Sequence, residues 1–235
     1  STINEGVLKD DYAIASGAGI GVLTKTLYGF QIGISGFFLY NLNSSDIDKA
    51  DSLTQNSNRY EVGLFDVENH TNKHDLDRLE ELYIKYNLSK SSLSLGKLNL
   101  NTPFFNPQDG RMRPTAEEGF WLSIKESKTI GFNGGWIWEI SPRSTVNWYS
   151  LSNSVGIYPA GVNENGKKSD YANNIVGNNG IVVANLYVNP TKNIKINFWN
   201  GFFENVMNTS ILEINAEQPL KKLKLYEGII YLHQN

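Results

Sequence analysis

The sequence predicts an all-β fold, an antiparallel transmembrane β-barrel, and three observations lead to this prediction. Short segments alternate apolar and polar residues with the period of two that is typical of β-strands. The connections between these segments are alternately short and long, and aromatic residues gather near the segment ends. Transmembrane barrels combine these features, because their strands face lipid on one side and the lumen on the other, with short turns at one end.

Composition limits the other possibilities. The chain has 235 residues, a formal net charge of -3 and no cysteine. It therefore lacks the basic footprint of a nucleic-acid-binding protein, and disulfides and thiolate metal sites are excluded. No signal peptide is recognised, and no apolar run approaches the ~20 residues of a membrane-crossing helix. Any membrane span must then be built from strands, because lipid tolerates only helices and closed barrels.

The first two predicted strands cover residues 12–25 and 30–40. In the second, Phe30, Ile32 and Ile34 fall on one face and Gln31 falls on the other. Glycines stud residues 16–22, but no helix follows them, so a nucleotide-binding loop is not predicted. A long polar connection, 41–77, follows, and within it residues 59–69 are expected to form ordered loop structure.

The next predicted strands, 79–88 and 92–100, are joined by a short turn at Ser89. Their apolar pattern slips in phase, since Leu93 and Leu95 are odd-numbered while Leu98 and Leu100 are even-numbered. A bulge near Gly96 would explain this slip. The connection 101–118 is long and contains three prolines, which stiffen a backbone without sheet partners.

The remaining predicted strands are 118–126, 129–140, 180–189, 193–203, 208–216 and 222–233, with a long polar stretch at 141–179. The count is about ten strands, each long enough to cross a bilayer. A soluble β-sandwich shows the same alternation and is the alternative. It has less reason to place all its long loops at one end.

Two stretches carry a resemblance to a known family. They read RLEELYIKYNLSKSSLSLGKLNLNTPFFNPQDGRMRPTAEEGFWL and ISPRSTVNWYSLSNSVGIYPAGVN, and together they span residues 78–163. The chain resembles the OprD-like family of outer-membrane porins. The resemblance implies location in the bacterial outer membrane, a barrel of roughly 18 strands and association as a homotrimer. Since about ten strands are visible, residues 1–235 are expected to form a single β-barrel domain that is an incomplete, interior segment of such a barrel.

The resemblance also implies a function. Members of this family form narrow channels for passive diffusion of small hydrophilic solutes, in which loop three folds into the lumen and basic residues guide carboxylate-bearing solutes. On this basis the loop 101–118 is expected to fold inward and form the pore constriction, with Arg143 on the facing wall. The predicted constriction residues are Asp109, Arg111, Arg113 and Arg143.

Four lysines fall on predicted polar strand faces and are candidates for a basic row in the lumen: Lys85, Lys97, Lys125 and Lys195. Ordinary solvated lysines would give the same pattern. A charge on the lipid face would cost about 2–4 kcal/mol at the middle of the bilayer, which favours inward orientation in a barrel.

No enzymatic activity, metal site or cofactor is predicted. His70 and His74 are four residues apart, but they lie in a polar loop without a third ligand at a fixed spacing. Two alternatives to a channel remain open: a β-rich surface or binding protein without a channel, and a barrel enzyme that acts on lipids.

The barrel interpretation also predicts which side chains face which medium. Lumen-facing positions are Gln31, Lys85, Asn133, Asn185 and Asn197. Lipid-facing positions are Phe30, Ile32, Ile34, Leu82, Ile84, Phe132, Trp136, Val182, Leu186, Ile194 and Ile196.

Overall fold

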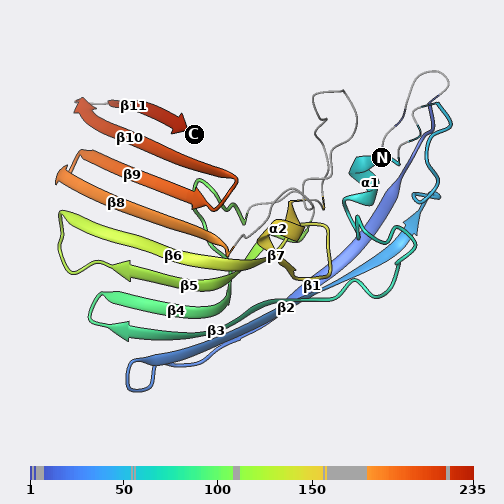
Figure 1. The fold of residues 1–235 in the computed structure, drawn as a ribbon, viewed down its shortest axis with the longest axis horizontal. Coiled ribbons are helices and arrows are strands. Elements are labelled where there is room, and N and C mark those ends of the chain that lie inside the picture. The colour runs from blue at the N-terminus through green and yellow to red at the C-terminus, as the bar shows by residue number, and fades with distance from the viewer. Residues whose placement is uncertain are drawn as a thin grey trace.

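Ten long strands and one two-residue strand form one antiparallel sheet in the computed structural model (Figure 1). The structure describes residues 1, 3, 8–53, 55, 57–107, 112–155, 157, 179–220 and 223–235. The elements are β1 (Ala13–Leu23), β2 (Phe30–Ser44), α1 (Arg59–Val62), β3 (Arg78–Leu88), β4 (Ser91–Leu98), β5 (Ala116–Ile124), β6 (Ile130–Ser141), β7 (Tyr149–Ser150), α2 (Leu151–Ser154), β8 (Ile181–Thr191), β9 (Ile194–Phe203), β10 (Met207–Leu220) and β11 (Leu223–Gln234).

Each long strand pairs with its neighbours in chain order, from β1 at one edge to β11 at the other, and β7 pairs only with β6. The β1–β2, β3–β4, β5–β6 and β8–β9 turns lie along the left of Figure 1. The long β2–β3 and β4–β5 connections and the short β9–β10 turn lie at the opposite ends of the strands. No helix in the described part of the chain is long and apolar enough to cross a membrane. β1 and β11 are not paired with each other among the described residues, so the sheet is a partial barrel.

The predicted assignment of side chains to the two faces is confirmed. Phe30, Ile84 and Leu186 are 50%, 44% and 45% exposed, as expected for lipid-facing side chains in an isolated chain. The register pairs Ile32 with Ile84, Phe132 with Leu186 and Val188 with Ile196 on this apolar face. On the opposite, polar face it pairs Gln31 with Lys85 and Asn133 with Asn185.

The predicted bulge near Gly96 is wrong. The register runs without a shift from Leu82–Lys97 through Tyr83–Gly96 to Leu88–Ser91. Leu93 and Leu95 lie on the apolar face, whereas Leu98 and Leu100 are buried in a cluster on the polar side. The phase slip therefore marks the point at which the side of the sheet that is polar elsewhere carries apolar side chains. These side chains are buried there by the β4–β5 loop, which includes Phe105.

A second cluster holds the long connections together. Leu39, Ile47, Val62, Phe65 and Leu76 are buried, and Val146 packs against them. The amide of Val67 donates to the Ser144 carbonyl at 3.0 Å, and the Tyr149 hydroxyl donates to Glu68. Burial, followed by the nearby Asp66 carboxylate, raises the pKa of Glu68 above its usual value. Residues 59–69 are thus ordered loop structure, as predicted, with the one-turn helix α1 at their start.

Candidate functional site: the polar face and the loop that covers it

Side-chain hydrogen bonds run along the polar face across neighbouring strands. Ser123 Oγ donates to Asn133 Oδ1 at 2.8 Å, and Asn133 Nδ2 donates to Asn185 Oδ1 at 3.2 Å. On β2 and β3, Ser35 Oγ donates to Glu81 Oε2 at 2.8 Å. Hydroxyls, amides and carboxylates thus cover this face. Such a wall can exchange hydrogen bonds with water and with hydrophilic solutes.

Aromatic side chains on the polar face lie flat along the wall. A Cβ atom at Gly135 would lie 2.9 Å from the Trp121 ring, so only glycine leaves room for that ring. Tyr83 lies over Gly33 and Tyr187 lies over Gly131 in the same way. The rings therefore fill the positions left by glycines and do not project far from the sheet.

The four predicted lumen lysines occupy different environments. Lys85 is half-buried on the polar face of β3, opposite Gln31 and Ser94. Lys97 lies on the same face as Leu93 and Leu95, where it pairs with Glu118 and sits 3.6 Å from the centroid of the Trp148 ring. Lys97 therefore does not join a basic row with Lys85, because the two side chains lie on opposite faces of the sheet. The Glu118 carboxylate balances the charge of Lys97.

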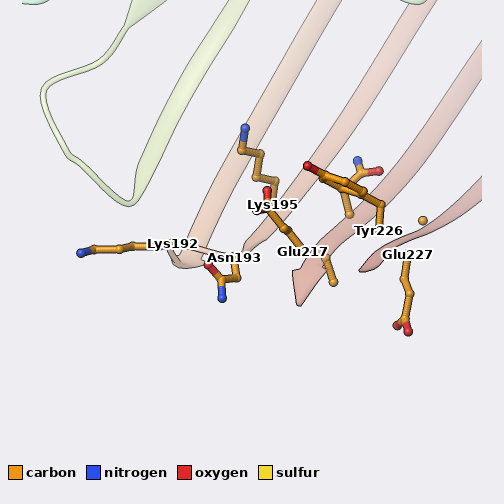
Figure 2. A pocket seen from close by; sticks show the side chains of 9 residues that line it. Lys192, Asn193, Lys195, Glu217, Tyr226 and Glu227 are labelled. Atoms are coloured by element: carbon orange, nitrogen blue, oxygen red, sulfur yellow. The ribbon is translucent and has the colours of Figure 1, made fainter. Parts of the chain in front are cut away.

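The other two lysines are near the short turns. β5 ends at Ile124, so Lys125 is an exposed turn residue and not part of a strand face. Lys195 lies on the polar face and lines a hollow of ≈ 260 Å³ together with Asn215, Glu217 and Tyr226 (Figure 2). Glu217 also forms an ion pair with Lys224 at 2.6 Å, so opposite charges meet at this end of the polar face.

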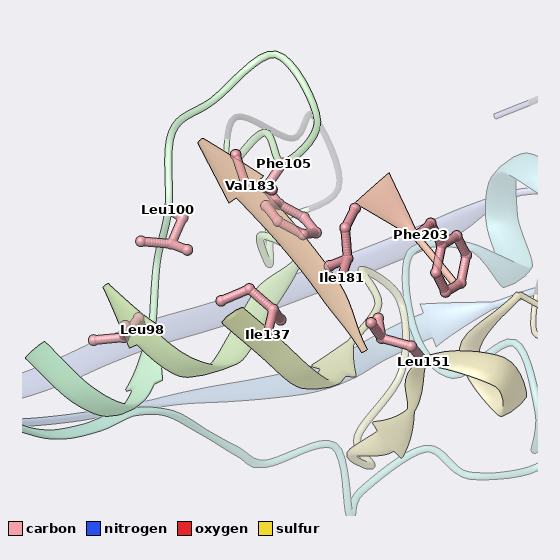
Figure 3. Close-up of a cluster of buried hydrophobic side chains, with 8 residues drawn as sticks. All are labelled: Leu98, Leu100, Phe105, Ile137, Leu151, Ile181, Val183 and Phe203. Carbon is pink, nitrogen blue, oxygen red and sulfur yellow. The ribbon is translucent and has the colours of Figure 1, made fainter. Parts of the chain in front are cut away.

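The described start of the β4–β5 loop (residues 99–115 in all) lies over the polar face, at residues 99–107. Thr102 begins a tight turn, in which its Oγ1 accepts hydrogen bonds from the amides of Phe104 at 3.1 Å and Phe105 at 2.9 Å. Phe105 is 6% exposed and is buried in a cluster with Ile181, Val183 and Phe203 of the β8–β9 wall (Figure 3). The inward fold of this loop is thus confirmed for its described part.

A close approach between Phe104 and Gly201 fixes the same loop. A Cβ at Gly201 would lie 2.8 Å from the Phe104 ring, so the ring occupies the space of the missing side chain on β9. Two adjacent phenylalanines therefore attach the loop to a wall that lies roughly 75 to 100 residues further along the chain. Apolar contacts, and not charges, hold this part of the loop.

Arg113 does not present its guanidinium to solvent, in contrast to the predicted position at the narrowest point of a pore. The residue is 0% exposed; it donates to the Leu76 carbonyl at 3.0 Å and to the Phe65 carbonyl. Arg113 therefore connects the β4–β5 loop to the β2–β3 connection. Asp109 and Arg111, the other predicted constriction residues of this loop, lie outside the described residues.

Arg143 is half-buried in the bend that follows β6, and its amide donates to Thr115 Oγ1 at 3.3 Å. It thus lies beside the end of the β4–β5 loop, where that loop enters β5. The prediction placed Arg113 and Arg143 in one region of the molecule. Of these two side chains, that of Arg143 is partly accessible, whereas that of Arg113 is buried.

Arg78 is a charged residue of this region that the sequence reasoning missed. Its side chain is 0% exposed, and it donates to Glu80 Oε1 at 2.8 Å, to the Ser141 Oγ at 3.2 Å and to the Pro142 carbonyl at 3.1 Å. Arg78 also donates to the Pro114 carbonyl. The only sequence signal was an Arg and a Glu two residues apart at the start of a strand, which is the spacing of side chains on one face.

An open antiparallel sheet with one lipid-type face, one hydrogen-bonding face and an inward loop defines part of a porin-like outer-membrane β-barrel. The model of the family described as outer membrane porin, OprD family, matches residues 21–235. The chain therefore belongs to the OprD family of outer-membrane porins, which places it in the bacterial outer membrane.

Solved structures share this fold. The chain matches Pseudomonas aeruginosa OccK9 (OpdG) with a TM-score of 0.69 at 16% identity, covering 94% of this chain and 51% of that one. It matches P. aeruginosa OpdK, determined with vanillate, with a TM-score of 0.68 at 16% identity, covering 94% and 52%. It matches Acinetobacter baumannii OccAB4 with a TM-score of 0.69 at 19% identity, covering 94% and 52%. No curated protein matches the chain in sequence. The chain spans about half the length of these structures.

Proposed function

We propose that the intact protein forms a narrow channel through which small hydrophilic solutes diffuse passively across the outer membrane. The observation that carries this proposal is the polar face with the β4–β5 loop fixed across it by Phe104 and Phe105. A loop anchored inside a barrel narrows the lumen without closing it, and the polar wall offers hydrogen bonds to a solute in transit. A homotrimer is the assembly that we propose with it.

Solutes that carry a carboxylate are the class that we propose for this channel. Lys85 and Lys195 lie on the polar face, and Arg143 lies near the inward loop. Cationic groups along a low-dielectric wall raise the local concentration of anions. A related structure, that of OpdK, was determined with vanillate, which is a carboxylate.

Conductance of the intact protein in a planar lipid bilayer tests the proposed function. A channel should give discrete, ohmic conductance steps, and a carboxylate solute such as vanillate should reduce the current while it occupies the lumen. A β-rich surface protein would integrate into membranes without conducting. Absence of steps from protein that is demonstrably inserted would therefore favour that alternative.

The two loop arginines should respond differently to substitution. Arg111→Ala is expected to shift the reversal potential in a salt gradient toward cations, because a charge at a constriction sets ion preference. Arg113→Met is expected to leave the reversal potential unchanged but to destabilise the protein. It removes the donor to the Phe65 and Leu76 carbonyls, and each buried carbonyl left without a partner costs about 1–3 kcal/mol.

Lys73→Ala, at an exposed position of the β2–β3 connection, is the control for both arginine variants, and it should change neither quantity. If Arg111→Ala leaves the reversal potential unchanged while Arg143→Ala shifts it, the constriction charge is on the wall and the loop only narrows the channel.

A further inference from the structure

Exposed lysines gather at the short-turn end of the sheet. At this end, each of the β1–β2, β3–β4, β5–β6 and β8–β9 turns carries at least one: the turn-side lysine band consists of Lys25, Lys90, Lys125, Lys128 and Lys192. The opposite end differs, since the connection 45–77 contains eight acidic and three basic residues. The chain as a whole has a net charge of -3, so a general excess of basic residues does not explain the band.

One acidic residue, Glu126, lies among the described residues of these turns, and its charge is held by a neighbouring turn. It accepts hydrogen bonds from Ser89 Oγ at 2.9 Å, the Lys90 amide at 3.1 Å and Ser91 Oγ at 2.7 Å. The hydroxyls of Ser91 and Ser89 lower the pKa of Glu126 below its usual value. These bonds also bring the β3–β4 and β5–β6 turns together, so Lys90, Lys125 and Lys128 belong to one surface.

The band continues toward the β8–β9 turn. Lys128 and Lys192 line one hollow of ≈ 350 Å³ between the β5–β6 and β8–β9 turns. Lys195 also lines it, and none of its lining residues is acidic. The lining of this hollow, which comes from the β5–β6 and β8–β9 turns and the start of β9, carries ammonium groups and no carboxylate, and therefore attracts anions. Glu217 and Glu227 line a neighbouring hollow with Lys192 and Lys195.

The position of the band along the strands indicates which class of anion the lysines would meet in a membrane. Phe30 and Tyr86, on the apolar face beside the β1–β2 turn, pack against each other with tilted rings whose centroids are 4.8 Å apart, and they are 50% and 40% exposed. Tyr28 in that turn is 91% exposed. In outer-membrane barrels, aromatic residues form girdles at the membrane–water interfaces. The lysines therefore lie just beyond the apolar face, at the level of the lipid headgroups.

We propose that the turn-side lysine band binds the phosphate groups of anionic phospholipids in the membrane leaflet on the short-turn side. In bacterial outer-membrane barrels this leaflet is the periplasmic one. The band selects lipids with a net negative charge over zwitterionic lipids and thereby fixes the depth and tilt of the barrel in the membrane. Long lysine side chains suit this role, since their apolar stems lie along the protein while their ammonium groups reach the phosphates.

Electron paramagnetic resonance of spin-labelled lipids tests the proposal. The intact protein is reconstituted in phosphatidylcholine vesicles that contain a trace of spin-labelled phosphatidylglycerol or spin-labelled phosphatidylcholine. The motionally restricted fraction of each label gives their relative association constant. We expect a preference for phosphatidylglycerol of about fivefold at low salt, which corresponds to the attraction of one lysine by an anionic surface. High salt should reduce this preference, because it screens exposed charges.

Substitution of all five band lysines by Gln should bring the ratio close to one, whereas substitution by Arg, which keeps the charge, should preserve it. Lys49→Gln with Lys73→Gln, at exposed positions of the acidic end, is the matched control and should also preserve it. A ratio that stays near fivefold in the Gln variant, or falls equally in the control, would overturn the proposal. The β-sheet signal in far-ultraviolet circular dichroism of each variant in the vesicles shows that it is folded, independently of conductance. A wild-type protein that selects anionic lipid but does not conduct would contradict the channel and not the lysine band.

Discussion

Phe105→Ala is expected to raise the single-channel conductance of the intact protein and to lower its stability. The Phe105 ring is buried against Ile181, Val183 and Phe203, and removing a buried phenylalanine side chain typically costs about 3–5 kcal/mol. Without this anchor the β4–β5 loop should leave the polar face more often, and the lumen should widen. The measurements are conductance in planar bilayers and the midpoint of denaturant unfolding in detergent.

Phe120→Ala is the control for Phe105→Ala, because Phe120 is 36% exposed on the apolar face of β5. It removes the same side chain without touching the loop and should leave conductance unchanged. Gly201→Ala provides an independent test, since its new methyl group would lie 2.8 Å from the Phe104 ring and should displace the loop while every phenylalanine is kept. Unchanged conductance in both Phe105→Ala and Gly201→Ala would show that the loop does not narrow the channel.

Arg78→Met is expected to destabilise the protein by about 3–5 kcal/mol, because it leaves the buried carboxylate of Glu80 without its ionic partner. The substitution also removes the donor to Ser141 and to the Pro142 carbonyl, which joins the start of β3 to the end of β6. Denaturant unfolding in detergent measures this loss. The double variant Arg78→Met with Glu80→Leu should recover part of it, since no unpaired charge is then buried.

The ion pair between Lys97 and Glu118 offers the matched comparison for Arg78. Its side chains are 18% and 25% exposed, against 0% and 11% for Arg78 and Glu80, and ion pairs contribute less as they become more exposed, down to about 0–1 kcal/mol at a surface. Lys97→Met should therefore cost much less than Arg78→Met. If the two losses are equal, or if Glu80→Leu does not rescue Arg78→Met, the buried pair is not what stabilises this end of the sheet.

The alternation along the strands was enough to predict the two faces of the sheet. The side chains of Phe30, Ile84 and Leu186 alternate with polar neighbours, and a strand has only two faces, so each assignment followed from a period of two. The division into short turns and long connections, and the resemblance over residues 78–163, further indicated a barrel of the OprD family. These features are local in the sequence, and no distant contact was needed to recognise them.

The tertiary structure decided which charges are exposed. Nothing in the local sequence marks Arg113 as buried, yet it is buried, because carbonyls 37 and 48 residues away, at Leu76 and Phe65, accept its hydrogen bonds. Leu98 seemed out of phase because it lies on the polar face, where an apolar residue was not expected. It is buried there in one cluster with Phe105 of the following loop and with residues of the distant strands β8 and β9. Burial depends on which segments meet in space, and a strand pattern carries no information about the partner that covers it.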